Sequence, residues 1–169
     1  MRMIFVTVGT HEQPFNRLIE HVDKLVQNKI ITEEVIIQTG YSTYKPNYCK
    51  WENFFSYDEM KKNVSDARIV ITHGGPSSFI MPLQIGKTPI VVPRIKDFGE
   101  HVNNHQIEFC KAVEKRMGII IVIEDVNELE NVIEKYSNIV GNIEKKAMSN
   151  NADFCLQFEK IVYEILENK

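Results

Sequence analysis

The segment Ile69-Val70-Ile71-Thr72-His73-Gly74-Gly75-Pro76-Ser77-Ser78 carries the clearest indication of the fold. Its first three residues form an apolar run typical of a buried strand, and the two glycines then allow a sharp turn. Pro76 stands where a helix would begin, because proline is favoured in the first helical turn. The N–H groups of a helix start attract anions, and Ser77 and Ser78 add hydroxyls, so the turn would suit a phosphate. The alternative interpretation is an ordinary tight turn between a strand and a helix.

Strand-like and helix-like segments alternate along the rest of the chain. We expect strands at residues 4–8, 35–37, 69–71, 89–93 and 119–123, with a further short strand closed by residues 54–55. We expect helices at residues 14–27, 57–67, 76–85, 105–115 and 126–136. Because the strands are continuous apolar runs, the pattern predicts an α/β fold, a Rossmann-like parallel sheet with helices on both faces. We expect one domain over residues 1–169, with residues 143–169 as a C-terminal helix.

The composition is that of a soluble globular protein. Hydrophobic residues make up 43% and charged residues 25% of the 169 residues, and the net charge of -3 argues against a nucleic-acid partner. Cys49, Cys110 and Cys155 form no CxxC pair, so we expect reduced thiols in a cytoplasmic protein. The apolar runs are too short for a signal peptide or a membrane span, so we expect any membrane contact to be made through a partner.

Several polar or glycine-rich segments follow expected strand ends, where parallel sheets bind their ligands. These are Gly9-Thr10, Gly40, residues 73–78 and Arg94, and Arg94 is a candidate phosphate contact. The P-loop, dinucleotide-binding and hydrolase-elbow motifs GxxxxGK[ST], GxGxxG and GxSxG do not occur. No acidic pair of the kind that holds a metal and a nucleotide sugar follows a strand, and we expect Asp125 to cap the next helix.

Further segments resemble a known family. They are Phe5–Thr10, His73–Phe79, Pro89–Arg94 and Glu100–Gln106. In this order they resemble glycosyltransferase family 28, which includes the peptidoglycan N-acetylglucosaminyltransferase and the small catalytic subunit of dolichol-linked chitobiose synthase. The sequence is most similar to the small subunits of split bacterial exopolysaccharide and capsule glycosyltransferases. The resemblance covers roughly residues 4–114.

The resemblance implies the C-terminal, nucleotide-sugar-binding half of a GT-B glycosyltransferase. A membrane-attached N-terminal half would be a separate partner subunit that carries the acceptor site and the catalytic base. The pair would be active only together, at the inner face of the membrane. It would move a hexose or N-acetylhexosamine from a UDP-sugar to a lipid-diphosphate-linked saccharide in polysaccharide biosynthesis, with inversion and without a metal or other cofactor.

Two other functions stay open on the sequence alone. One is a non-catalytic activating or regulatory subunit of such a transferase, and the other is an unrelated Rossmann-like nucleotide-binding enzyme. An isolated chain could also form a homodimer through the face that its partner would cover.

The resemblance also implies roles for individual residues. Gly9, Thr10, His73, Gly74, Gly75, Ser77 and Ser78 would approach the diphosphate, with Arg94 beside them. Backbone groups around Ser56 and Tyr57 would hold the uracil, and His105 and Gln106 would contact the donor sugar. His11 is a candidate base on this chain, and it is equally compatible with a place in an ordinary loop.

The sequence departs from the family at one position. Well-known members carry a glutamate that grips the ribose on the helix after the glycine turn, and here Met81 stands at or beside that position. Since no acidic residue lies between Pro76 and Gly86, ribose contact would fall to another residue such as Gln84.

Overall fold

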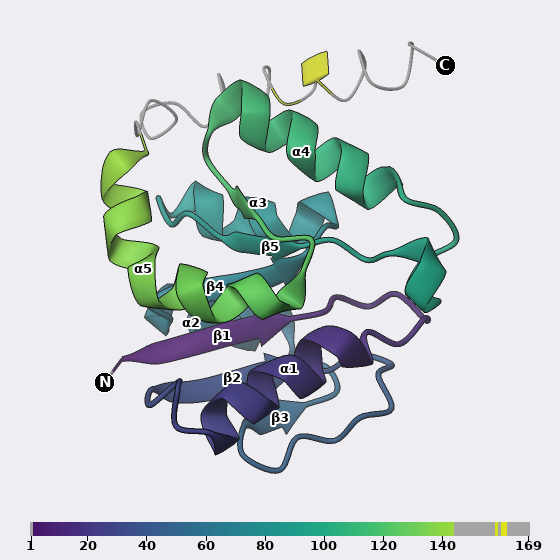
Figure 1. Cartoon of the computed structure of the whole chain (residues 1–169), viewed down its shortest axis with the longest axis vertical. Helices are drawn as coiled ribbons and strands as arrows, with labels where there is room; N and C mark the ends of the chain where they lie inside the picture. The colour runs from purple at the N-terminus through teal and green to yellow at the C-terminus, as the bar shows by residue number, and fades with distance from the viewer. Residues whose placement is uncertain (1, 144–157, 159, 162–169) are drawn as a thin grey trace.

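A six-stranded sheet forms the centre of the protein in the computed structural model, which describes residues 2–143, 158, 160 and 161 (Figure 1). The strands are β1 (Met3–Thr7), β2 (Glu34–Gln38), β3 (Lys50–Glu52), β4 (Ile69–His73), β5 (Ile90–Val92) and β6 (Ile121–Val122). Their order across the sheet is β3-β2-β1-β4-β5-β6, and every neighbouring pair is parallel. The carboxyl ends of all six strands therefore lie at one edge of the sheet.

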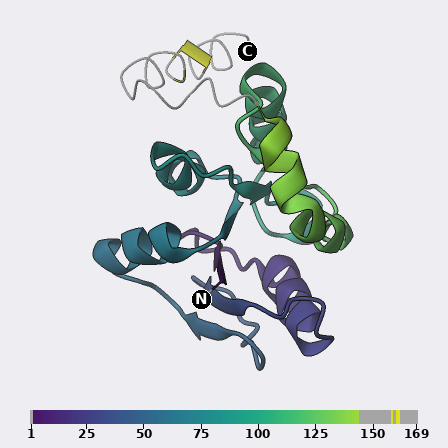
Figure 2. The ribbon, with the colours of Figure 1, turned by 90° about the vertical axis from the view of Figure 1, so that its left-hand side faces the viewer.

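Helices cover both faces of this sheet, as Figure 2 shows from the side. The helices are α1 (Asn16–Gln27), α2 (Tyr57–Asp66), α3 (Pro76–Gln84), α4 (His105–Met117) and α5 (Leu129–Asn142), with 3₁₀ turns η1 (Lys96–Phe98) and η2 (Val126–Glu128). Helices α1 and α5 pack on the face that holds Ile4 and Val6, whereas α2 and α3 pack on the face that holds Phe5 and Val70. The predicted Rossmann-like α/β fold is confirmed.

The short strand predicted to close at residues 54–55 is wrong, because the structure places β3 at Lys50–Glu52. The N–H groups of Thr39 and Gly40 donate to Glu52 O and Asn53 O, which continues the pairing with β2. Phe55 has already left the sheet, since its N–H donates to a side chain, Gln38 Oε1.

In the C-terminal third of the chain, the observed bounds of the elements differ from the predicted ones. Strand β6 has two residues rather than the five expected, and α5 extends to Asn142. Asp125 caps the start of η2 through its side chain, as predicted. The predicted helix over residues 143–169 lies outside the described residues apart from residues 143, 158, 160 and 161, of which Phe158 packs edge-on against Phe109.

A buried carboxylate on α1 fastens the loop of residues 41–49. Asp23 is 1% exposed and accepts hydrogen bonds from the Tyr44 hydroxyl and the N–H groups of Asn47, Tyr48 and Cys49. Tyr44 is thereby part of the cover over α1, while Tyr41 remains exposed. Burial alone would raise the pKa of Asp23, but these hydrogen bonds outweigh burial and lower it.

Replacing Asp23 with asparagine is expected to lower the free energy of unfolding by about 2 kcal/mol at pH 7, because an amide nitrogen would face N–H donors. A carboxylate with a lowered folded pKa stabilises the protein fully above its unfolded pKa of about 4 and loses that contribution below it. The gap between wild type and Asp23→Asn in urea unfolding should therefore narrow below about pH 4. An equal gap at pH 7 and at pH 3 would contradict this account.

Candidate functional site

Two glycine turns meet around one histidine at the carboxyl edge of the sheet, and a third glycine turn lies against the first of them. A methyl group on Gly9 would lie 2.3 Å from His73 Cε1, and one on Gly75 would lie 2.3 Å from His73 Nε2. A methyl group on Gly40 would lie 2.6 Å from the carbonyl oxygen of Gly9. Gly9 and Gly40 also have positive φ, at 73° and 54°. Bare backbone is therefore required at all three turns, and the predicted convergence of Gly9, Gly40 and residues 73–78 is found.

The start of α3 is open to a ligand. Gly75 is the N-cap residue and provides no side-chain cap, and Pro76 occupies the first turn as predicted. Ser77 is exposed and Ser78 is half-buried, and the Ser78 N–H already donates to Gly75 O. The positive end of the helix therefore lies at the turn that follows β4, with two serines in its first turn.

Gln106 at the start of α4 contacts the same turn. Its Oε1 accepts a hydrogen bond from Arg94 N–H at 3.1 Å, and a methyl group on Gly74 would lie 2.9 Å from it. The carboxamide is therefore anchored through its oxygen, and its nitrogen is the end that can donate to a ligand. His105 is exposed one residue earlier, with Nδ1 3.7 Å from a Glu108 carboxylate oxygen.

Ser56 and Tyr57 lie at the start of α2. The Ser56 N–H donates to the Glu59 carboxylate at 2.8 Å, and the Ser56 hydroxyl and the Glu59 N–H complete a capping box. Tyr57 is 69% exposed. The N–H groups of Phe55 and Ser56 are already bonded inside the protein. A nucleobase bound here would therefore contact neighbouring backbone groups, such as Tyr57 N–H.

Arg94 has a different position from the one expected. Its side chain is buried, and the guanidinium donates to the carbonyl oxygens of Val8 at 2.9 Å, Gln13 at 2.7 Å and Glu100 at 3.0 Å. The expectation that Arg94 reaches a phosphate is corrected: its guanidinium is directed at backbone carbonyls. It holds the turn after β1 against the loop of residues 95–100.

His73 fills the space between the two turns as a neutral ring. Burial, followed by the nearby Arg94 guanidinium, lowers the pKa of His73 to about 3. The imidazole is therefore uncharged at neutral pH, and its contribution is shape and polarity rather than charge.

The rings of His11 and His101 lie against each other at a tilt of 42°, with their centroids 4.9 Å apart. His11 Nδ1 accepts the N–H of Gln13 at 3.2 Å, and His101 Nδ1 accepts the N–H of Asn103 at 3.3 Å. A neutral imidazole that accepts at Nδ1 carries its proton on Nε2. His11, the candidate base, is thus a hydrogen-bond donor in this arrangement. Its pKa is lowered by burial and then by the positive charge of Arg94.

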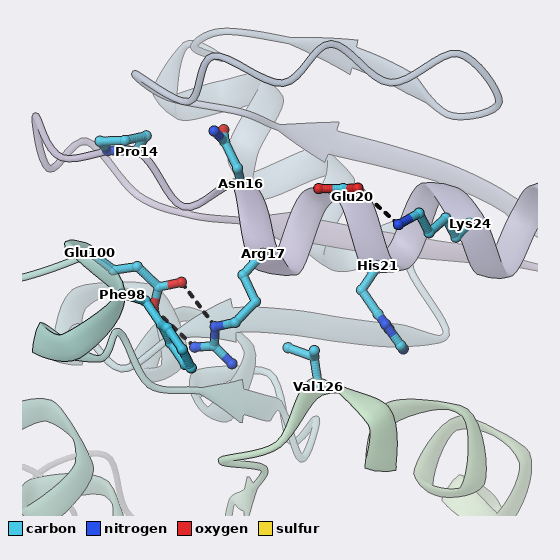
Figure 3. Close-up of a pocket in the computed structure, with 9 residues that line it drawn as sticks. All are labelled: Pro14, Asn16, Arg17, Glu20, His21, Lys24, Phe98, Glu100 and Val126. Carbon is cyan, nitrogen blue, oxygen red and sulfur yellow. Dashed lines mark hydrogen bonds and ion pairs between the residues drawn. The ribbon is translucent and has the colours of Figure 1, made fainter.

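The loop after β5 is held by an ion pair that the sequence did not predict. Arg17 on α1 forms a two-pronged pair with Glu100, with both N···O distances at 2.9 Å, and Glu100 also accepts the Ile95 N–H. Figure 3 shows this pair at the side of a pocket of about 450 Å³. The pocket is lined by Pro14, Asn16, Arg17, Glu20, His21, Lys24, Phe98, Glu100 and Val126, none of which was a predicted site residue.

Two further polar residues went unpredicted: Thr7 and Gln38, the last residues of β1 and β2, which are 1% and 4% exposed. The available signal was a polar residue directly after an apolar run, of Met3–Val6 in β1 and of Val35–Ile37 in β2. Among the described side chains, no group of three His, Cys, Asp or Glu is arranged to hold a metal ion. None of the helices in the described part of the chain is long and apolar enough to cross a membrane.

The sequence matches the model of the glycosyltransferase family 28 C-terminal domain over residues 3–166. It is 32% identical over 129 residues to the human UDP-N-acetylglucosamine transferase subunit ALG13, covering 68% of this chain and 10% of that protein. The ALG13 subunit of Yarrowia lipolytica is 29% identical over 137 residues, covering 72% of this chain and 64% of that protein. The chain thus spans about a tenth of the human relative.

Solved glycosyltransferases share the fold at low sequence identity. The glycotransferase of kitacinnamycin superposes with a TM-score of 0.56 at 14% identity, covering 83% of this chain and 35% of that one. The calicheamicin glycosyltransferase CalG4 gives a TM-score of 0.54 at 12% identity, covering 97% of this chain and 44% of that one. This likeness concerns the fold and matches less than half of each larger enzyme.

Proposed function

This chain belongs to the family of glycosyltransferase family 28 C-terminal domains, and on that basis we propose that it is the donor-binding subunit of a UDP-sugar glycosyltransferase. The observation that carries the proposal is the meeting of the Gly9 and Gly75 turns on His73, beside the uncapped start of α3. We propose that the bare turns let a diphosphate approach the start of α3, where N–H groups and hydroxyls would bind it.

The chemistry that we propose for this chain is stabilisation of the departing UDP. Negative charge grows on the diphosphate as the bond to the sugar breaks, and donors fixed in advance lower that barrier. Gly9, whose N–H is bonded to Thr7 Oγ1, would let the diphosphate approach the bare turn, and Thr10 would contribute a hydroxyl from the same side. The α3 start with Ser77 and Ser78 would contribute from the other side. We propose that these groups suffice without a metal and that the sugar is transferred with inversion.

Contacts to the rest of the donor follow from the positions of α2 and α4. The uracil would lie against the backbone at Ser56 and Tyr57, and His105 and Gln106 would reach the sugar hydroxyls. Met81 packs against the apolar cluster under α2 and α3, so it offers the ribose no acidic group. Relatives named as UDP-N-acetylglucosamine transferase subunits support an N-acetylhexosamine donor.

The partner that we propose is a membrane-attached N-terminal half with the lipid-linked saccharide acceptor and the catalytic base. The word subunit in the relatives' names supports a complex of this kind. The Nε2–H form of His11 also favours a base on the partner. We place the complex at the cytoplasmic face of the membrane, in polysaccharide biosynthesis. Without the partner, exposed Phe98 and Val102 would favour a homodimer.

A second candidate function is a non-catalytic activating subunit of the same transferase. The apolar Met81, in place of an acidic ribose contact, is the observation that favours it. Measurement of UDP binding separates the two functions, because an activating subunit need not bind the donor.

Replacing Ser77 and Ser78 together with alanine is expected to weaken UDP binding about tenfold, because two hydroxyl donors to the diphosphate are lost. Calorimetric titration with UDP, on the chain alone and with its partner, measures this. Ser137→Ala is the matched control, since Ser137 is an exposed serine on α5 outside the site. The proposal fails if neither the chain nor the complex binds UDP saturably, or if the double variant binds as the wild type does.

A further inference from the structure

We propose that Gln38 is a positioning residue that couples the Gly9 turn to the segment of residues 55–57. The inference rests on the proposed donor site, in which the turn contacts the diphosphate and the segment holds the base. In this role Gln38 would set both the affinity for the donor and the preference for uracil, although Gln38 contacts neither the diphosphate nor the nucleobase.

A continuous chain of hydrogen bonds carries the inference. Gln38 Oε1 accepts the Phe55 N–H at 3.1 Å, and Gln38 Nε2 donates to Thr7 Oγ1 at 3.1 Å. Thr7 Oγ1 also accepts the Gly9 N–H at 3.2 Å. Two side chains, Gln38 and Thr7, therefore link the backbone just before Ser56 to the backbone of the glycine turn.

The position of this chain in the sheet argues for a role beyond packing. Thr7 lies opposite both Gln38 and Thr72 in the strand register, and the preceding row on the same face is apolar and includes Phe5 and Val70. Apolar side chains would fill the last row equally well, and buried polar groups are costly unless they are bonded. Here the oxygen of the Gln38 amide is bonded to backbone that leads into the site, and its nitrogen is bonded to the Thr7 hydroxyl, which in turn accepts the Gly9 N–H.

The row of polar side chains at the strand ends continues to β4, which leads into the Gly74-Gly75 turn. Thr72, the neighbour of Thr7 on β4, is fully buried, and its hydroxyl has no partner among the described residues. It stands two residues before Gly74. The polar ends of β2, β1 and β4 thus lie side by side beneath the segments that would hold the base and the phosphates.

Coupling of this kind acts by preorganisation. The base and the diphosphate of one nucleotide sit at a fixed separation, so a site that holds both segments in register loses less freedom on binding. Without Gln38 the two segments move independently. The contacts of the base segment then weaken most, because Phe55 N–H loses its only side-chain anchor in the described structure.

The test is to titrate UDP and CDP into wild type, Gln38→Met and Thr7→Val. CDP carries the same diphosphate and differs at the edge of the base. We expect Q38M to weaken UDP binding about thirtyfold and CDP binding only about threefold, so that the preference for uracil shrinks. We expect T7V, which leaves the tie from Gln38 to Phe55, to weaken both nucleotides equally, by about fivefold.

Asp23→Asn is the matched control, because Asp23 is another buried polar group that fastens a loop, and its hydrogen bonds go to Tyr44, Asn47, Tyr48 and Cys49, none of which is a proposed donor contact. It should lower stability and leave both dissociation constants within about twofold. Equal losses of UDP and CDP in Q38M, or none, would overturn the inference while the donor site stands. If wild type itself does not bind UDP, the proposed function and the inference fall together.

A measurement on the wild type covers the case in which Q38M does not fold. Hydrogen exchange at the Phe55 and Gly9 amides should slow together on addition of UDP, by similar factors, because Gln38 and Thr7 link them in one chain of hydrogen bonds. Slowing at only one of the two amides would contradict the coupling.

Discussion

Gly9→Ala is expected to abolish measurable UDP binding, with a loss of affinity of more than about a hundredfold. The added methyl group would lie 2.3 Å from the His73 ring, and a φ of 73° is strained for alanine. His73 is buried and wedged against Gly75 on its other side, so the ring cannot retreat without opening the second turn. Calorimetry with UDP measures the loss of affinity, and urea unfolding shows how much structure remains.

Gly118→Ala is the control that separates the two effects of Gly9→Ala, backbone strain and steric overlap with His73. Gly118 has a φ of 61°, and a methyl group there would meet nothing within 4 Å. It should cost about 1 kcal/mol of stability and leave UDP binding unchanged. Wild-type affinity in Gly9→Ala would refute the placement of the diphosphate at this turn.

Arg94→Met is expected to destabilise the protein by about 4 kcal/mol and to remove UDP binding with it. The buried guanidinium satisfies three carbonyl oxygens, of Val8, Gln13 and Glu100, and a methionine would leave all three without that donor. Two of them bracket the Gly9 turn, so the turn loses its support. Urea unfolding and UDP titration measure the two effects.

Arg94→Lys distinguishes this role from direct phosphate binding. A lysine keeps the charge but cannot present the forked donors of a guanidinium. If Arg94 holds carbonyls, Arg94→Lys should be nearly as unstable as Arg94→Met. If Arg94→Lys instead keeps wild-type stability and loses UDP affinity, that result would show that Arg94 contacts a phosphate, as expected from the sequence.

The parts of the fold that the sequence predicted are those set by local chemistry. The apolar run of β4, the glycine turn and Pro76 at the start of α3 lie within ten residues, and the structure has them in that order. Strand β3 was misplaced because Lys50-Trp51-Glu52 has no apolar run, and its position depends on pairing with the edge of β2.

The parts of the site that the sequence did not predict depend on partners far away in the chain. The side chain of a residue that follows a strand can point toward the ligand or into the core. The Arg94 side chain points inward because it donates to the carbonyl oxygens of Gln13 and Val8, which are 81 and 86 residues away in the sequence. Gln38 owes its position to Thr7 and Phe55, 31 and 17 residues away. No local pattern reports such contacts.

Titration of the isotope-labelled chain with UDP, followed by NMR at each backbone amide, would locate the donor site residue by residue. We expect saturable shifts at Gly9, Thr10, Gly75, Ser77 and Tyr57, with residues around the Arg17–Glu100 pocket and at the amino ends of the strands unchanged. Shifts confined to that pocket, or no saturable shift with the partner present, would contradict a donor site at the carboxyl edge of the sheet.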